Sequence, residues 1–207
     1  MIITAIKQAK KHQFEVVFDE ESVFLDKDTV VKNGLKIGQN FDDESVAKLR
    51  YESECTRATS KAMWLVSRRD YSKKEMILRL KKDGFDIDAV NNAVELLSES
   101  SVIDDERFAY NFAYNLKANR KLGRRAIVTE LLLKGVSREI AEEVSAEFCD
   151  NDSDVETAKE IIESKYCGFD NDEKIKRRMI AALARKGYSY DIVKKAIAEI
   201  ENERDYL

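Results

Sequence analysis

The chain has 207 residues, of which 43% are hydrophobic and 37% are charged, and its net charge is −4. This composition indicates a folded protein with amphipathic helices, and no segment has the basic excess of a dedicated nucleic-acid binder. Proline is absent, and no apolar run reaches the roughly 20 residues that span a bilayer, so we expect long helices and no membrane association.

The first 40 residues differ in kind from the rest. Residues 14–18 and 22–25 are short runs rich in β-branched and aromatic residues, and residues 29–31 are a candidate for a third strand. We expect a small antiparallel sheet that is too small to be stable alone and therefore packs against the helices that follow. Residues 1–52 are predicted to form this β-rich N-terminal extension, together with a short helix.

From about residue 53 onward, one pattern occurs three times. It is anchored by Gly84, Gly135 and Gly187, which are 51 and 52 residues apart. Self-similarity at a fixed period indicates a repeat architecture, and glycine supplies the left-handed residue that ends a helix. Eight, seven and four positions before each glycine stand apolar residues that share one helix face: Met76, Ile77 and Leu80; Ile127, Val128 and Leu131; Met179, Ile180 and Leu183.

A second helix is predicted to follow each glycine, and a third to precede the glycine helix. The following helices begin at good N-cap residues, which are Asp86, Ser137 and Ser189. The preceding helices are predicted at about residues 53–69, 106–116 and 155–166. The fold class is therefore mainly α, with three tandem three-helix repeats at residues 53–103, 104–152 and 153–207.

Pairs of basic residues recur eleven and ten positions before each glycine, where they are expected to open the middle helix of each repeat. Positive charge at a helix N-terminus is mildly unfavourable, so helix stability does not explain them. They are candidates for contacts with phosphates or with an acidic partner surface, and a solvated helix face is the alternative. The candidate contact residues are Lys73, Lys74, Arg124, Arg125, Lys176, Arg177 and Arg178.

Three other features have simple structural interpretations. Asp104 and Asp105 suggest a metal or acid–base site, but an N-cap with first-turn charge is the preferred interpretation. Tyr110, Phe112 and Tyr114 alternate on one helix, so they cannot all face one core; they are expected to pack mainly between adjacent units, with one or two exposed partner contacts as the alternative. Trp64 is predicted to lie in the core.

No motif for chemistry is found in the sequence. It has no glycine-rich phosphate loop, no Cys/His metal cluster and no nucleophile motif, so we expect no enzyme activity, no catalytic residues, no metal and no cofactor. Cys55, Cys149 and Cys167 lack metal-ligand spacing. Their odd number and the lack of a signal peptide predict reduced thiols in the cytoplasm.

Three segments together resemble the RecX family of regulatory proteins. Residues 69–76, with Arg69, Ser72, Glu75 and Met76, resemble its Arg-x-x-Ser-x-x-Glu-Leu segment, although Met76 replaces leucine. Residues 102–109 resemble its Leu-Asp-Asp-x-Arg-Phe-Ala motif, and residues 123–136 resemble its Gly-x-x-x-Ile, Glu-Leu and Lys-Gly-Ile run. The matching signature residues in this chain are Asp104, Asp105, Arg107, Phe108, Ala109, Gly123, Leu131, Lys134 and Gly135.

The resemblance covers residues 67–148 strongly and most of the chain more loosely. It implies an elongated, curved array of three-helix repeats. It also implies a partner, the RecA recombinase filament on single-stranded DNA, whose ATP hydrolysis and strand exchange such proteins usually restrain. We expect a monomer that regulates this filament by binding. The alternatives are a helical repeat that binds single- or double-stranded DNA through its basic pairs, and a helical adaptor for another partner.

Overall fold

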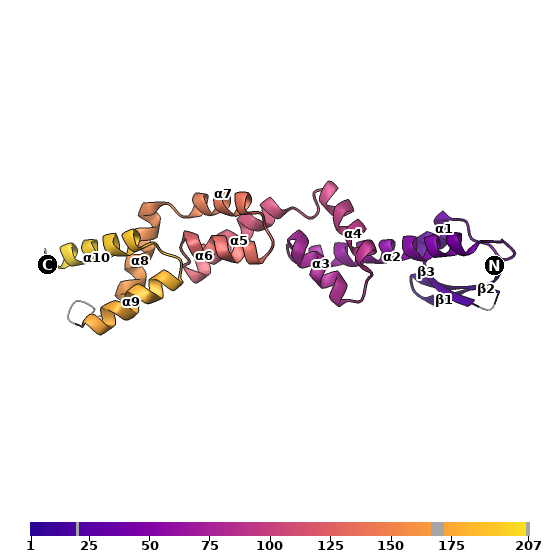
Figure 1. The fold of residues 1–207 in the computed structure, drawn as a ribbon, viewed down its shortest axis with the longest axis horizontal. Coiled ribbons are helices and arrows are strands. Elements are labelled where there is room, and N and C mark those ends of the chain that lie inside the picture. The colour runs from indigo at the N-terminus through magenta and orange to yellow at the C-terminus, as the bar shows by residue number, and fades with distance from the viewer. Residues whose placement is uncertain (20, 167–171, 206–207) are drawn as a thin grey trace. The chain divides into compact units, whose positions relative to one another are not determined.

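The computed structural model describes residues 1–19, 21–166 and 172–205, so Cys167 lies outside the described residues. A three-stranded antiparallel sheet precedes a series of helices (Figure 1). The strands, in sheet order, are β1 (Ile3–Lys10), β2 (Gln13–Phe18) and β3 (Glu21–Asp26). The helices are α1 (Lys27–Lys32), α2 (Asp43–Val66), α3 (Lys73–Lys82), α4 (Ile87–Glu99), α5 (Asp105–Arg120), α6 (Arg124–Leu133), α7 (Arg138–Phe148), α8 (Asn151–Lys165), α9 (Glu173–Arg185) and α10 (Tyr190–Asp205).

The chain forms two compact units, Met1–Asp104 and Asp105–Leu207. The first unit contains the sheet and helices α1–α4, and the second contains α5–α10. Each group of three consecutive helices from α2 onward encloses its own apolar cluster, and a further cluster lies under the sheet. The prediction of three three-helix repeats after a small sheet is confirmed.

The sheet packs on α2, as expected. Phe18 of β2 and Leu25 of β3 are fully buried, in one cluster with Val46 and Leu49 of α2. The backbone N–H of Asp26 also donates to the hydroxyl of Ser53 on α2 at 2.6 Å. The sheet therefore depends on α2 for its core, which is why so small a sheet is stable.

Two details of the N-terminal prediction are wrong. Residues 29–31 are helical, because Asp26 caps α1 by accepting from the N–H of Asp28 at 2.9 Å. Strand β1 was not predicted, since most of its side chains are exposed and its second half is polar. Without apolar alternation, the sequence of β1 gives no strand signal.

Helix α2 belongs to two cores at once. It begins at Asp43, where the carboxylate of Asp42 accepts from the N–H of Ser45 at 2.8 Å. Its first half packs on the sheet, and its second half packs Ala62 and Leu65 against α3 and α4. The boundary that we placed between residues 52 and 53 therefore falls inside a helix. The boundary between residues 152 and 153 likewise falls inside α8.

The three glycine turns have one geometry. Gly84, Gly135 and Gly187 have φ angles of 92°, 86° and 92°, in the left-handed region. In each turn the N–H of the residue after the glycine donates to the carbonyl of a buried leucine five positions earlier, at 3.2–3.3 Å. That leucine, which is Leu80, Leu131 or Leu183, is fully buried. The turn therefore fixes the third helix of each domain against the core residue of the second.

These glycines predict a graded set of substitution effects. In Gly84→Ala the new Cβ meets nothing within 4 Å, so only the left-handed φ is penalised and the free energy of unfolding falls by about 1–3 kcal/mol. Gly135→Val should lower the free energy of unfolding by at least as much as Gly84→Ala, because a β-branched side chain resists a left-handed φ more strongly than alanine does. Gly187→Ala loses more, since its Cβ would lie 2.3 Å from the nitrogen of Ala126. Urea unfolding measures all three, and equal losses for Gly84→Ala and Gly187→Ala would contradict the close approach.

Candidate partner-binding surface

The first two basic pairs lie at the start of the second helix of their domains. Lys73 and Lys74 open α3, after the buried Ser72 that caps it by accepting from the N–H of Glu75 at 3.1 Å. Arg124 and Arg125 open α6, after Gly123, which makes no side-chain cap. All four basic side chains are exposed. Arg124 donates to the carbonyl of Glu142 on α7 at 3.4 Å.

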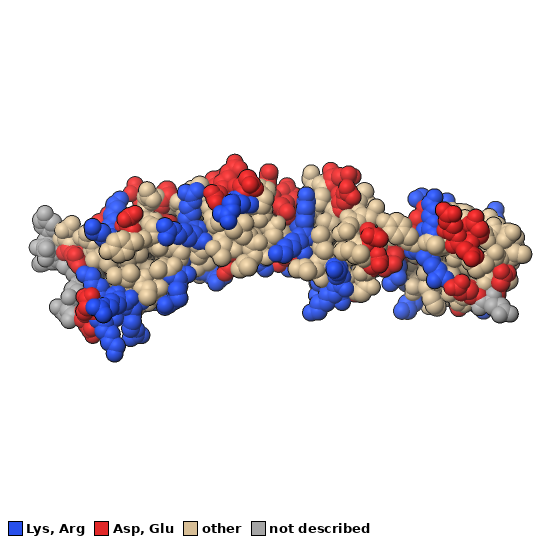
Figure 2. Space-filling view, viewed as in Figure 1, with Lys and Arg blue, Asp and Glu red and all other residues tan. Residues whose placement is uncertain are grey.

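The third basic group lies elsewhere on its helix, so that part of the prediction is wrong. Helix α9 begins at Glu173, capped by Asp172, and Lys176, Arg177 and Arg178 follow after its first residues. Lys176 lies 3.7 Å from Glu201 and Arg177 lies 3.5 Å from Glu173. Figure 2 shows basic side chains gathered over the first half of α9. These three groups of basic residues, which we call the basic stations, recur at a fixed spacing in the sequence. The first two begin their helices, whereas the third begins at the fourth residue of its helix.

In the second unit, the end of α9 meets the start of α6. The N–H of Gly123 donates to the carbonyl of Lys186 at 2.8 Å, and the N–H of Arg125 donates to the carbonyl of Gly187 at 3.3 Å. Backbone N–H groups at the start of α6, which have no partner within their own helix, are thus satisfied by backbone carbonyls at the end of α9. The two helix dipoles are joined head to tail, and the negative end of α9 lies beside the arginine pair. The partial negative charge at the end of α9 offsets the unfavourable interaction of these arginines with the positive end of the α6 dipole.

The α6–α9 junction requires glycine on both sides. A Cβ on Gly123 would lie 2.9 Å from the carbonyl carbon of Gly187, and a Cβ on Gly187 would lie 2.6 Å from the Cβ of Ala126. Gly123 has an ordinary φ of −82°, so its need for glycine comes from the contact alone. The sequence indicated the turn at Gly187 but not this approach, because its partner lies 64 positions away in the chain.

Polar contacts surround the junction. The Tyr188 hydroxyl donates to the carbonyl of Lys121 at 2.9 Å, and the Lys186 ammonium donates to the carbonyl of Arg120 at 2.6 Å. Burial raises the pKa of Tyr188, so its hydroxyl stays protonated as a donor. Burial and then repulsion from Lys165, Arg120 and Lys121 lower the pKa of Lys186. Lys186 therefore lies among three other cations, of which Arg120 and Lys121 are paired with glutamates.

A buried ion pair joins the domains beneath the junction. Lys117 of α5 pairs with Asp154 of α8, whose side chain is 2% exposed. Nearby, burial raises the pKa of Cys149 to about 11, with Asp154 adding to the shift. Cys149 is therefore a protonated thiol in the core of its domain.

Most of the family-signature residues have structural roles. Phe108, Ala109 and Leu131 are buried in the second domain's core, and Gly135 makes its turn. Lys134 lies 5.4 Å from the centroid of the Phe112 ring. Earlier in the chain, Gly123 forms the junction with Gly187.

The acidic part of the signature lies at a helix start. Asp105 is in the first turn of α5 and Asp104 directly precedes it, while Arg107, two residues after Asp105, is exposed. Within residues 1–19, 21–166 and 172–205, no group of three or more His, Cys, Asp or Glu side chains is placed to hold a metal ion. The helix-start interpretation of the two aspartates fits this position.

Two aromatic predictions are wrong. Trp64 is 48% exposed, with Lys61 and Arg68 at 4.7 and 4.4 Å from its ring centroid, because it lies on the side of α2 that faces away from α3 and α4. Tyr110 and Tyr114 are also exposed. They contact Phe148 of the same domain, at centroid distances of 4.9 and 6.1 Å, rather than packing between units.

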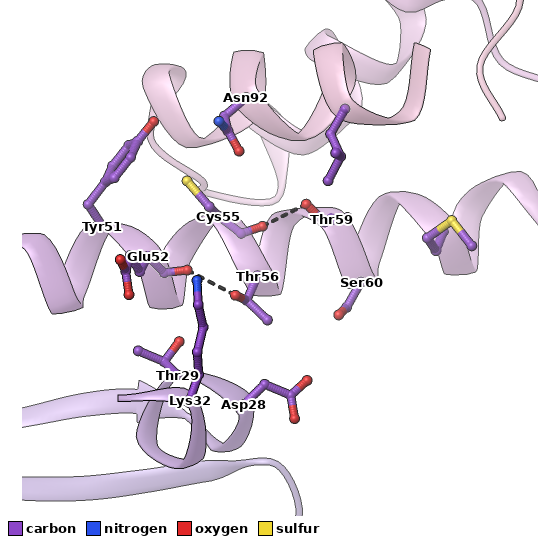
Figure 3. Close-up of a pocket in the computed structure, with 12 residues that line it drawn as sticks. Asp28, Thr29, Lys32, Tyr51, Glu52, Cys55, Thr56, Thr59, Ser60 and Asn92 are labelled. Atoms are coloured by element: carbon purple, nitrogen blue, oxygen red, sulfur yellow. Dashed lines mark hydrogen bonds between the residues drawn. The ribbon is translucent and has the colours of Figure 1, made fainter. Parts of the chain in front are cut away.

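The first unit also contains an open hollow of about 720 Å³ between α1, α2 and α4, which the sequence did not indicate. Figure 3 shows Tyr51, Cys55 and Thr59 along α2 and Asn92 above them on α4. Thr59 donates to the carbonyl of Cys55 at 2.9 Å, and burial raises the pKa of the Cys55 thiol. A protonated thiol beside hydroxyls that are bonded to their own helix does not make a nucleophile.

The Lys117–Asp154 pair gives a stability prediction. In Lys117→Met a buried carboxylate loses its partner, so the second unit should lose about 3–5 kcal/mol. Lys121→Met is the matched control, because it removes only the exposed pair with Glu160 and should lose at most about 1 kcal/mol. Chemical unfolding measures both. Adding Asp154→Leu to Lys117→Met should restore most of the stability, and failure to do so would contradict the unpaired-charge explanation.

Comparison with known proteins gives one consistent result. Family models match three segments in order, namely the first three-helix domain of RecX at residues 58–97, the second at residues 104–144 and the third at residues 152–197. Regulatory protein RecX from Bacillus subtilis is 28% identical over 209 residues, covering 98% of this chain and 78% of that protein. The RecX of Caldanaerobacter subterraneus is 29% identical over 199 residues, covering 95% and 98%.

Two solved structures have the same fold. A crystal structure of regulatory protein RecX superposes with a TM-score of 0.74 at 17% identity, covering 93% of this chain and 97% of that one. The RecX structure from Lactobacillus salivarius has a TM-score of 0.65 at 21% identity, covering 72% and 97%. Among the described helices, none combines the length and the apolar character that crossing a bilayer requires.

Proposed function

Because the chain belongs to the RecX family of regulatory proteins, which are not enzymes, we propose that it binds the RecA recombinase filament on single-stranded DNA. Binding restrains the ATPase and strand-exchange activities of the filament, and the protein acts in the cytoplasm as a monomer. The observation that carries this proposal is the ordered match of all three domains, each with basic residues on its second helix.

The proposed action is conformational. A ligand shifts an equilibrium only by binding one state better than another, so the protein must contact a surface that differs between filament states. Contacts at several stations suit this task, because repeated partners lie along a filament. In the second unit, about 15 Å of helix α9 separates Arg177 from the arginine pair of α6, at 1.5 Å per helical residue.

A second candidate function is direct binding of DNA through the basic stations. Its support is the exposure of Lys73, Lys74, Arg124 and Arg125. Phosphate binding would weaken steeply with salt, with a log–log slope of about −0.7 for each single-strand phosphate neutralised. Sedimentation with naked single-stranded DNA, beside recombinase filaments, at two salt concentrations separates the two functions.

The arginine pair provides the test. Replacing Arg124 and Arg125 together by Gln should raise the concentration needed for half-inhibition of the recombinase ATPase by about tenfold or more, since one charge-assisted hydrogen bond contributes about that factor. Gln is preferred to Glu because a carboxylate there would be repelled by the end of α9. Circular dichroism should show unchanged helicity and melting.

The control must be chosen from the structure. Lys117 and Lys121 precede the pair in sequence but are unsuitable, because Lys117 is in the buried ion pair. Arg138 and Lys194 are exposed and lie on the third helices α7 and α10. Their joint replacement by Gln removes the same charge and should leave inhibition unchanged. Equal loss in both double variants would mean that bulk charge acts, and no loss in either would place the contact on another surface.

A further inference from the structure

A second, smaller hollow lies beside the α6–α9 junction. Its volume is about 280 Å³, it is open to solvent, and it is bordered by the end of α5, one side of α6 and the end of α9. Three arginines from these three helices line it, namely Arg120, Arg125 and Arg185. Only Arg125 was a candidate from the sequence, since the other two belong to no recurring pair.

The positive charge of this hollow is only partly compensated. Arg120 pairs at 3.1 Å with Glu130, which also lines the hollow, so one of the three arginines is neutralised. Among the described residues, neither Arg125 nor Arg185 has an ion-pair partner. The ammonium of Lys186 lies nearby, bonded to the carbonyl of Arg120. Guanidinium groups that line one small hollow repel each other unless an anion joins them, and they suit carboxylates or phosphates.

Apart from Thr129 and Glu130, the rest of the lining is apolar. Leu133 is 68% exposed at the end of α6, and Leu122, Ala126 and Ala184 extend the apolar surface. None of the lining residues is aromatic, so the hollow has no platform on which a nucleic-acid base would stack. The chain's net charge of −4 also disfavours a long polyanion. An exposed leucine beside unpaired arginines matches a ligand that has both a carboxylate and an apolar side chain.

We propose that this hollow binds an acidic peptide segment of a partner protein, with its carboxylates on Arg125 and Arg185 and a neighbouring apolar side chain on Leu133. The ligand class is a short peptide that alternates Asp or Glu with Leu or a similar residue. The site is rigid, because the Gly123 and Gly187 contacts fix α6 and α9 to each other. The inference stands on this geometry and does not require that the partner is the recombinase.

The test is a direct binding measurement without recombinase. The full-length protein is titrated into a dye-labelled peptide, Leu-Glu-Asp-Leu-Glu-Asp, and fluorescence anisotropy is recorded. The comparison probes are Ser-Glu-Asp-Ser-Glu-Asp, which has the same charge, and a short oligothymidylate. We expect the leucine peptide to bind more tightly than either comparison probe.

Variants assign the binding to the hollow. Arg125→Gln with Arg185→Gln should raise the Kd for the leucine peptide by about tenfold or more, while Arg138→Gln with Lys194→Gln should leave it unchanged. Leu133→Ser should raise the Kd for the leucine peptide by about fivefold and leave the Kd for the serine peptide unchanged. All these side chains are exposed, so folding should be retained, and melting temperatures check this.

Three outcomes would overturn the proposal. They are no measurable binding of the leucine peptide, tighter binding of the oligothymidylate than of the peptide, and equal weakening in the two double variants. No recombinase is present in this titration. Its result therefore does not depend on whether the protein inhibits the filament in the earlier experiment.

Discussion

Each three-helix domain depends on a left-handed glycine that ends its second helix. The glycine allows the next N–H to reach the carbonyl of a buried leucine, so the polar closure of the turn and the apolar core are fixed by the same residue. The following helix then starts at once on a capping aspartate or serine. Helix order, helix spacing and core position in a domain all follow from this turn.

The second unit uses one of these turns twice. Gly187 ends α9, and its carbonyl also accepts from the start of α6, so a turn within the third domain becomes the contact with the second. This close approach excludes any side chain at Gly123 or Gly187. Two helix dipoles are aligned, and arginines that would be unfavourable at an isolated helix start lie beside backbone carbonyls. The basic residues of α6 and α9 consequently belong to one compact unit.

This arrangement is suited to binding and not to catalysis. The signature residues of this chain are mostly core, turn or junction positions, and the exposed basic residues are distributed over second helices. Such a surface can distinguish states of a repeating partner through several weak contacts, each of which depends on salt. The arginine-lined hollow, our proposed peptide site, would add a more specific contact, because it combines charge with an exposed leucine.

The sequence by itself determined the repeat, the glycine turns, the caps and the buried positions, because these are local features with a period that a single chain displays. It did not determine where α2 begins or that β1 exists, since the first depends on a sheet packed against the helix and the second lacks apolar alternation. It also did not show that Trp64 is exposed, because periodicity alone does not say which side of a long helix is covered.

The tertiary structure alone decided which residues join the second and third domains. The contacts of Gly123 with Gly187, of Lys117 with Asp154 and of Arg125 with the hollow it shares with Arg185 connect residues far apart in the chain. No spacing rule links such residues, because their distance depends on how helices from different repeats pack. The sequence placed basic residues at recurring positions, and packing decided which of them have ion-pair partners and which line a site.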